Sequence, residues 1–520
     1  MRFRFGLFLA VMPALHAAVV SRDWSDGTLT LKLDDGSAEI EWLSPVSVRF
    51  ARSFGGPLPP TRISHEKVTP TFEDAGSILS MKTRYLTVEV DRSDVRIRVR
   101  NAETPITDNI ASWANGHANL QLALKPDERV FGLMGGLKLN LRGETFERQH
   151  GFFFTSAGFG MFLSSPESHS FDMSKGVIES RGSSFEYELY YGPTAKEIME
   201  QHATLHPQNE VKAPALDLLS RDQLPKQAAA LPNTAVRSWE ALAALVRTIN
   251  QWSLSAIAFP ALDLSVFDFA PREIKARASD LSSMLPILYR SSGEGGVDVS
   301  TREAWTPYLI TYLREAYDRG YPIVRPLPME FSRDASSERQ ADVFMLGDEV
   351  LLAPVLGPGN KRRLELPRGN WTDVRTNAEY RGNQSIEVAA PPGRVPMFVR
   401  NGWILPLASK DRMELHYYPS LGGEFFLWEP DVNENSQFHA APAGDFVRVE
   451  IESQKRRTYE WVLHHTKAPH DVGEDSGAYQ RATSQDQLKP GTWWHDAQQN
   501  NLHVMLRAEP RTDRIVNISF

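Results

Sequence analysis

The sequence predicts a multidomain protein of the α/β plus all-β class, in which β-rich segments flank one segment that mixes helices and strands. The chain has 520 residues, 41% of them hydrophobic, which is enough for several cores and suggests three or four domains. Apolar and polar residues alternate through much of 19–206 and 334–520, as they do in half-buried strands. Apolar residues at helical spacing are concentrated in 207–333.

The N-terminus has the pattern of a secretory signal peptide. Two arginines precede an apolar run at 5–15, and Ala17 or Ala18 provides a cleavage position. The apolar run is too short to span a membrane, so we expect a signal peptide over 1–18. A buried N-terminal strand is the alternative interpretation. The expected location of the protein is therefore periplasmic or secreted.

Composition excludes several function classes. Without cysteine, the protein cannot form disulfides, thiolate metal sites or thiol nucleophiles. A net charge of −8 gives no sign of nucleic-acid binding, and no later apolar run is long enough for a membrane helix. Three histidines and an aspartate within 464–471 suggest a metal, but their spacing matches no ligand pattern, so a solvated loop is favoured. We expect no metal, no cofactor, no nucleic-acid partner and no membrane partner.

The first β-rich segment shows the alternation of antiparallel strands. The clearest hairpin has apolar residues on both sides of an Asp-Asp-Gly turn at 34–36, namely Leu29, Leu31, Leu33, Ala38, Ile40 and Trp42. Arg96, Arg98 and Arg100 interleave the apolar residues of a later strand. They could bind an anion, but a solvated sheet face is the favoured interpretation.

Two helices are predicted in the mixed segment. The first follows Ser238 and has an apolar face formed by Trp239, Leu242, Val246 and Ile249. The second begins with a capping box of Ser300 and Glu303 and is stopped by Gly320 and Pro322.

Four phrases within 325–407 form the most specific pattern in the chain. The run 350–356 is apolar on both faces and predicts a buried strand, with Pro354 near an edge or end. Asn401-Gly402 lies between two apolar runs and predicts a type I′ hairpin. The phrases are RPLPMEF (325–331), GDEVLLAPVL (347–356), LPRGNW (366–371) and APPGRVPMFVRNGWILPL (390–407).

These phrases, in this order and spacing, closely resemble glycoside hydrolase family 31, the α-glucosidases and α-xylosidases with a β-domain behind a catalytic (β/α)8 barrel. Segments 130–143, 151–165 and 185–205 resemble the family's N-terminal β-sandwich and the helix that leads to the barrel. The resemblance implies a galactose-mutarotase-like β-sandwich at 19–206, a (β/α)8 barrel region at 207–333, and proximal and distal C-terminal β-sandwich domains at 334–410 and 411–520.

The barrel region is too short for the fold that the resemblance implies. Residues 207–333 number 127, counting both ends, whereas a (β/α)8 barrel takes about 250 residues. The sequence therefore predicts a truncated or degenerate barrel.

The catalytic carboxylates of the family are not found in their expected phrases. A retaining glycosidase needs a nucleophile and an acid/base residue roughly 5 Å apart. The resemblance places Thr234 at the acid position, and a threonine cannot protonate a leaving sugar. Asp217 is a candidate nucleophile because Ala-Leu-Asp echoes the family's Trp-Leu-Asp. An alignment to the barrel's entrance strand, which ends in Ser220 and Arg221, explains the same residues better.

Two substrate-binding residues are implied by the resemblance. Asp263 stands where the family has Asp-Ile-Gly-Gly-Phe and is expected to contact sugar hydroxyls; the alternative is a solvated aspartate at a strand end. Arg290 is kept from an Arg-x-His phrase in which Ser292 replaces the histidine. It is expected to contact a sugar or to pair with Asp263, and a plain surface arginine is the alternative.

Tryptophans in the last segment offer further sugar contacts. Trp428, Trp493 and Trp494 could stack on pyranose rings, although core packing is commoner for such residues, and 491–506 predicts a closing hairpin. By resemblance the protein hydrolyses α-glucosides or α-xylosides in carbohydrate metabolism through a retaining, two-carboxylate mechanism, with turnover expected to be weak or absent. The alternatives are a non-catalytic carbohydrate-binding pseudoenzyme and a deletion-derived, non-functional product. An oligosaccharide or glycoside is the expected ligand, and a homo-oligomer is left open.

Overall fold

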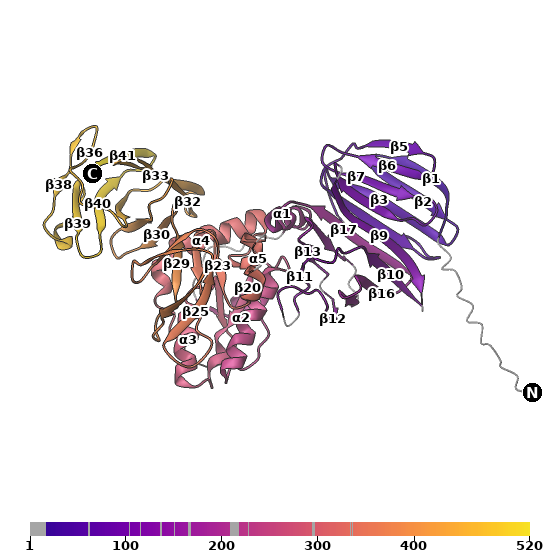
Figure 1. Cartoon of the computed structure of the whole chain (residues 1–520), viewed down its shortest axis with the longest axis horizontal. Helices are drawn as coiled ribbons and strands as arrows, with labels where there is room; N and C mark the ends of the chain where they lie inside the picture. Colours follow the sequence, from indigo (N-terminus) through magenta and orange to yellow (C-terminus); the bar gives the residue numbers. More distant parts are fainter. Residues whose placement is uncertain are drawn as a thin grey trace, which may run out of the picture. The chain divides into compact units, whose positions relative to one another are not determined.

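The computed structural model describes residues 17–60, 63–102, 104–114, 116–135, 138–149, 151–164, 168–207, 218–226, 228–293, 297–332, 334 and 336–520. Nearly all of the predicted signal peptide lies outside these residues. The chain divides into two compact units, one formed by residues up to Val130 together with Leu141–Pro193, and one formed by Phe131–Asn140 and Thr194–Phe520. Sheets dominate both units (Figure 1). In the described part of the chain, no helix is long and apolar enough to cross a membrane.

The first unit is built on two antiparallel sheets. The eight-stranded sheet has the order β1 (Val19–Ser25), β2 (Thr28–Leu33), β3 (Gly36–Ser44), β4 (Ser47–Ser53), β17 (Ser184–Tyr191), β14 (Phe159–Phe162), β13 (Phe153–Thr155) and β11 (Val130–Gly132). The nine-stranded sheet has the order β12 (Thr145–Arg148), β15 (His169–Asp172), β16 (Val177–Arg181), β10 (His117–Leu122), β9 (Thr104–Ala114), β8 (Ile97–Asn101), β7 (Thr87–Asp91), β6 (Ile78–Lys82) and β5 (Thr71–Ala75). The two sheets face each other, because the amide of Asn109 on β9 lies 3.4 Å from the Tyr187 hydroxyl on β17. This is a β-sandwich.

Two expectations for this unit can be compared with its strands. The predicted hairpin is present as β2 and β3, with Leu33 opposite Gly36 and Leu29 opposite Ile40. The three alternating arginines all lie near carboxylates: Arg96 is 3.2 Å from Asp94, Arg98 is 3.8 Å from Asp91, and Arg100 pairs with Glu89. Their charges are therefore balanced within the sheet.

The second unit contains a small parallel sheet and five α-helices in its described residues. Its strand order is β18 (Leu219–Ser220), β21 (Ile287–Arg290), β20 (Pro260–Asp263) and β19 (Ala229–Ala230), and each neighbouring pair is parallel. The helices of the unit are α1 (Ala195–Leu205), α2 (Trp239–Ser253), α3 (Arg272–Ser282), α4 (Arg302–Arg319) and α5 (Leu327–Glu330).

Both helices predicted in the mixed segment form. Helix α2 buries Leu242, Val246 and Ile249, as the helical spacing predicted. Helix α4 begins one residue later than expected, with Thr301 as its N-cap, and Ser300 contributes only its backbone carbonyl to the Glu303 N–H, so the predicted capping box is wrong. The C-terminal end of α4 is where Gly320 was expected to place it, because Gly320 adopts the left-handed conformation (φ +71°).

The remainder of the second unit consists of β-sheets. A six-stranded sheet has the order β22 (Val324–Pro326), β23 (Phe344–Leu346), β24 (Val350–Leu352), β29 (Met397–Arg400), β26 (Asn370–Asp373) and β27 (Glu379–Arg381), and β25 (Lys361–Leu366) pairs with β28 (Gln384–Ala389). A second sheet has the order β30 (Ile404–Ala408), β31 (Met413–Tyr417), β35 (Arg457–Leu463), β40 (Asn501–Ala508), β39 (Thr492–Asp496) and β38 (Gln480–Arg481). A third has the order β32 (Gly423–Glu429), β33 (Glu434–Ala443), β34 (Phe446–Ser453), β41 (Thr512–Ser519), β36 (Asp471–Glu474) and β37 (Gly477–Ala478).

The Asn401-Gly402 hairpin prediction is wrong. The strands on its two sides, β29 and β30, belong to different sheets, so the dipeptide is a passage between sheets. Gly402 has a positive φ of 96°, but Asn401 does not have the positive φ that a type I′ turn requires. The run 350–356 is buried as far as Val355, although only its first three residues form β24. The hairpin predicted at 491–506 is present as β39 and β40.

Candidate functional site

Three sequence-predicted positions meet at one edge of the parallel sheet. Because all four strands run in the same direction, their carboxyl ends share an edge, which is where α/β sheets place ligand-binding residues. Ser220 ends β18 and lies opposite Arg290, the last residue of β21. Asp263 ends β20 and lies opposite Tyr289. The sheet therefore brings Asp263 and Arg290 to the same edge.

Asp263 is almost completely buried, with 1% of its surface exposed. Its Oδ1 accepts hydrogen bonds from the backbone N–H of Ser265 (2.9 Å) and of Ser291 (3.2 Å). Burial alone would raise its pKa, but the hydrogen bonds from Ser291 and Ser265 outweigh burial and hold the pKa below its ordinary value. The carboxylate is therefore ionised at neutral pH, and the alternative of a solvated strand-end aspartate is wrong.

The second oxygen of this carboxylate is the notable atom of the site. Oδ2 of Asp263 is buried and has no hydrogen-bond partner among the described residues. A buried carboxylate oxygen without a partner carries a desolvation cost of about 1–3 kcal/mol, or more because it is charged. Such an atom requires a partner of some kind, either water or a ligand hydroxyl.

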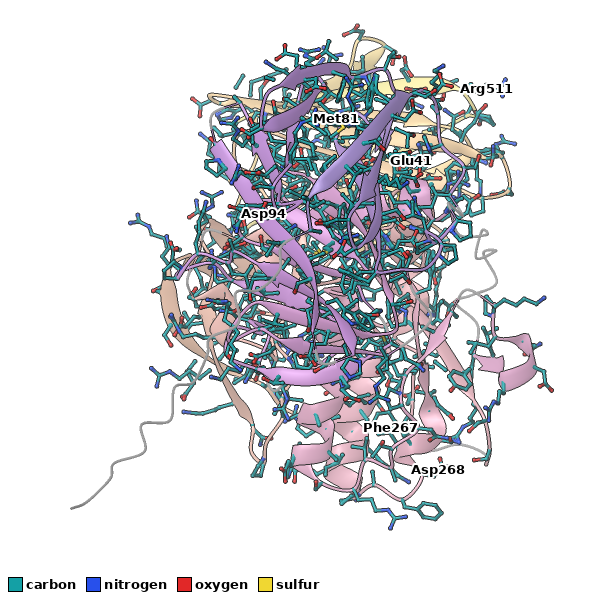
Figure 2. All side chains as sticks on the ribbon, turned by 90° about the vertical axis from the view of Figure 1, so that its right-hand side faces the viewer. Glu41, Met81, Asp94, Phe267, Asp268 and Arg511 are labelled. Atoms are coloured by element: carbon teal, nitrogen blue, oxygen red, sulfur yellow. The ribbon has the colours of Figure 1, made fainter. Side chains whose placement is uncertain are left out.

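Arg290 pairs with a different carboxylate from the one that was expected. Its Nη2 lies 2.7 Å from Oδ1 of Asp268, and its Nη1 lies 3.0 Å from Oδ1 and 3.3 Å from Oδ2. Asp268 directly follows Phe267, the last residue of the short helix η3 (Leu264–Phe267), and Figure 2 labels both residues. The side chains of both partners are largely buried, so Arg290 is not a plain surface arginine, and Asp268 is the carboxylate with which it pairs.

Several residues of this edge were missed from sequence. The hydroxyls of Ser265 and Ser291 lie 3.0 Å apart, and their backbone N–H groups hold Asp263. Tyr289 is 4% exposed, and its pKa is raised by burial and by the negative charge of Asp263. Only the contact between Asp263 and Ser265 had a readable signal, because Asp-x-Ser is typical of an Asx-turn. The others depend on which strands become neighbours.

The candidate catalytic positions contribute no carboxylate to the described edge. Thr234 lies in the loop after β19 and is exposed. Asp217 lies outside the described residues, so its position relative to Asp263 is not part of the described site.

The tryptophans and histidines of the C-terminal sheets have mainly packing roles. Trp493 is 5% exposed, and the ring of Trp494 lies tilted against that of His503, with ring centroids 5.1 Å apart. Trp428 is half-buried beneath the guanidinium of Arg314, 4.6 Å from its ring centroid. His464 is buried against Tyr418, with ring centroids 4.2 Å apart, so a solvated loop is wrong for this histidine.

A pocket of about 610 Å³ lies away from Asp263 and Arg290, neither of which lines it. Its lining includes Asp280 near the end of α3, together with Trp305 and Arg394. Helix α3 ends just before β21 begins, so this pocket is near the amino ends of the parallel strands. Burial raises the pKa of Asp280 to about 6.

Residues 320–405 match the glycosyl hydrolase family 31 C-terminal domain. Alpha-glucosidase 2 of Bacillus thermoamyloliquefaciens is 29% identical over 193 residues, which cover 35% of this chain and 23% of that enzyme. The alpha-xylosidase of Saccharolobus solfataricus is 31% identical over 136 residues, covering 24% of this chain and 19% of that enzyme. The matched part thus spans less than a quarter of these relatives.

Solved structures share the fold over almost the whole chain. A family 31 dextranase of Flavobacterium johnsoniae, complexed with glucose, superposes with a TM-score of 0.85 at 13% identity, covering 98% of this chain and 100% of that chain. The cycloalternan-forming enzyme of Listeria monocytogenes, complexed with a pentasaccharide substrate, gives a TM-score of 0.81 at 13% identity, covering 97% and 77%. The chain is therefore similar to glycoside hydrolase family 31 in its C-terminal domain at 320–405, and over part of its length to the α-glucosidases and α-xylosidases.

Proposed function

We propose that this protein binds α-glucosyl or α-xylosyl glycans at the carboxyl edge of its parallel sheet and hydrolyses them weakly or not at all. The observation that carries the proposal is the buried, ionised Asp263, whose Oδ2 has no partner among the described residues. A sugar hydroxyl is a suitable partner, because it donates one hydrogen bond to a carboxylate oxygen and needs no opposite charge. The glucose and pentasaccharide complexes of the structural neighbours support a carbohydrate as the ligand class.

The low turnover follows from the carboxylates of the described edge. Retaining hydrolysis needs two carboxyl groups about 5 Å apart, one free to attack and one free to donate a proton. Asp263 is ionised and cannot act as the acid. Asp268 is engaged by two nitrogens of Arg290, which leaves it poorly placed to move a proton. Loss of a general acid typically costs 10² to 10⁴ in rate.

The proposal includes the origin of the parallel sheet. Four parallel strands with intervening helices are what a shortened (β/α)8 barrel would leave, and we interpret 207–333 in this way. The outer strands β18 and β19 have two residues each, which is short for an edge that would recruit another chain. The shortened sheet therefore supports a folded protein better than a non-functional deletion product. The domain boundaries at 206, 333 and 410 and export by a signal peptide over 1–18 belong to the same proposal.

The test uses the purified full-length protein. Chromogenic α-glucoside and α-xyloside report turnover, and calorimetry with the corresponding oligosaccharides reports binding. Asp263→Asn keeps the shape of the side chain but removes its charge, and Asp445→Asn is the control because Asp445 is 82% exposed in the turn between β33 and β34. We expect binding without turnover, and a loss of affinity of about 10- to 100-fold in Asp263→Asn only.

Two results would count against the proposal. Turnover that Asp263→Asn abolishes would show an active hydrolase, and the absence of any oligosaccharide binding would remove the carbohydrate-binding function. Coding DNA around residues 222–231 that shows an internal deletion relative to neighbouring genes would favour a non-functional product.

A further inference from the structure

A second hollow of the same unit, which we name the basic groove, has a volume of about 540 Å³. It lies between helix α2 and strand β25, which are both labelled in Figure 1. Twelve residues line it: Ala243, Arg247, Arg339, Ala341, Asp342, Val355, Leu356, Gly357, Pro358, Lys361, Arg362 and Arg363. Neither Asp263 nor Arg290 is among them, so the groove is separate from the glycan site proposed above.

Hydrogen bonds between its walls fix the groove in place. The side chain of Asn250 on α2 donates to the carbonyl of Ala341 at 2.8 Å. Gln340 binds the backbone of Glu365 on β25 twice, through its amide nitrogen and its amide oxygen, each at 2.8 Å. Arg277 on α3 donates to the carbonyl of Gly359 at 2.9 Å. The loops that shape the groove are therefore held on both sides, and a ligand would meet a preformed surface.

The lining carries an excess of positive charge in a chain whose net charge is −8. Five of its residues are cationic and one, Asp342, is anionic. Three of the cations are paired: Arg362 with Asp342 at 2.8 Å, Arg339 with Glu365 at 3.1 Å, and Lys361 with Glu387 at 2.6 Å.

Arg247 and Arg363 form no close ion pair among the described residues, although Arg363 lies opposite Glu387 on β28 and its charge helps to lower the pKa of that carboxyl. Arg247 is half-buried on α2 and has no hydrogen bond there, and Arg363 on β25 bonds only to the hydroxyl of Ser385, at 3.1 Å. A guanidinium presents its N–H groups in a fork that matches a carboxylate or sulfate. Two guanidinium groups without a close ion pair, one on α2 and one on β25, are thus a site for a ligand with two or more negative charges.

We propose that the basic groove binds an acidic glycan, a polysaccharide that carries carboxylate or sulfate groups, with Arg247 and Arg363 as its principal anion contacts. The lining includes no aromatic residue. Neutral sugars and nucleic-acid bases are both commonly held by stacking on aromatic rings, so this groove has to recognise its ligand by charge. The choice of a glycan over other polyanions rests on the carbohydrate-binding function proposed above. The acidic net charge of the whole chain also disfavours a nucleic acid.

The experiment measures binding of the full-length protein to four probes at low and physiological salt. The probes are oligogalacturonate for carboxylates, a heparin oligosaccharide for sulfates, neutral dextran oligosaccharide and duplex DNA. The test variant is the double substitution Arg247→Gln and Arg363→Gln. The control variant is Arg511→Gln, an exposed arginine labelled in Figure 2 that lies in the turn between β40 and β41, away from the groove lining.

We expect one or both acidic glycans to bind, the affinity to fall at least tenfold in the double variant, and its salt dependence to become shallower, with the control unchanged. The two acidic probes distinguish carboxylate from sulfate as the preferred group. Acidic-glycan binding that the double variant leaves unchanged would overturn the proposal, as would DNA that binds as tightly as either glycan, or no binding by either acidic probe. Equal melting temperatures of the three proteins exclude misfolding as the cause. Binding of the neutral dextran probe tests the Asp263 site and should be lost in Asp263→Asn but not in the double variant. The two proposals can therefore fail independently of each other.

Discussion

The guanidinium of Arg290 binds Asp268 through two nitrogens, at 2.7 and 3.0 Å from the same carboxylate oxygen. Arg290 ends β21, and Asp268 follows the short helix that begins after β20, so this ion pair ties together the loops of two adjacent strands. The nearby Asp263, at the end of β20, has one oxygen without a partner among the described residues. Of these two carboxylates, Asp268 is engaged by the arginine and Asp263 has an oxygen that a ligand could bind.

The Arg290 and Asp268 pair is expected to stabilise the second unit. The side chains of the two residues are 13% and 22% exposed, so the charges are only partly screened by water. In a double-mutant cycle with Arg290→Gln and Asp268→Asn, we expect a coupling free energy of roughly 1–3 kcal/mol, measured by urea unfolding. Strictly additive effects of the two substitutions would contradict a direct stabilising contact.

Glu349 is expected to make the second unit less stable as pH rises towards neutrality. Burial and the charge of Asp348 raise its pKa to about 7. Its Oε2 lies 2.6 Å from the hydroxyls of both Tyr308 and Tyr312, and the Tyr308 hydroxyl also lies 2.5 Å from the carbonyl of Leu346. One tyrosine proton cannot serve both acceptors, and a protonated Glu349 removes the conflict by donating to Tyr308.

The sign of this pH effect follows from linkage. A folded-state pKa above the unfolded value contributes stability that is complete below about pH 4.5 and is lost as pH rises through 7. The free energy involved is roughly 3 kcal/mol, at 1.36 kcal/mol per pKa unit. Glu349→Gln should remove most of this dependence, which melting temperatures between pH 4.5 and 8 would measure. If the melting temperature of Glu349→Gln changed with pH in the same way as that of the parent protein, Glu349 would not be the source of the pH dependence.

His464 is expected to make the second unit less stable as pH falls, which is opposite to the effect of Glu349. Its pKa is lowered well below the ordinary value by burial and by the nearby His416, His465 and His503. The unfolded chain therefore binds a proton near pH 6.5 that the folded chain does not, and stability is lost as pH falls below that value. His464→Gln should show a smaller loss between pH 6.5 and 5 by differential scanning calorimetry. Comparing each variant with the parent at the same pH separates this effect from that of Glu349.

Gly320 is expected to be intolerant of a side chain for two separate reasons. Its φ is +71°, and an added Cβ would lie 2.4 Å from the Cβ of Ala203 on helix α1. Gly320→Ala should therefore lose about 2–4 kcal/mol, the sum of left-handed strain and overpacking. Gly444→Ala is the matched control, because Gly444 has φ +66° and nothing within 4 Å of the added Cβ. Equal losses of stability in the two variants would show that contact with α1 contributes nothing.

Local patterns in the sequence predicted many of the elements. The hairpin of β2 and β3, the apolar face of α2 and the end of α4 at Gly320 each follow from side-chain periodicity or from one turn residue. The resemblance to family 31 could also be recognised from the sequence, because it depends on short motifs of consecutive residues. The failures were local patterns with more than one outcome, such as Asn401-Gly402, where a dipeptide suited to a tight turn instead joins two sheets.

Only part of the candidate site could be predicted from the sequence. Asp263 and Arg290 were found through motif positions, and the structure does bring both to one sheet edge. Their partners were not found, because Ser291 and Asp268 are separated from them in sequence by 28 and 22 residues respectively. The basic groove also could not be predicted, since it is formed by one helix, two loops and a strand from distant segments.

The sequence by itself determined the family resemblance, the periodicity of the strands and helices, and the shortness of segment 207–333. Those properties depend on residues that are close together in the sequence, because their spacing alone determines on which face of a helix or strand each side chain lies. Only the tertiary structure decided that Arg290 binds Asp268, that Asp263 is buried with one oxygen lacking a described partner, and that Arg247 and Arg363 share a groove. Such relationships depend on which distant segments pack together, and that choice is made by burial over the whole unit rather than by any local pattern.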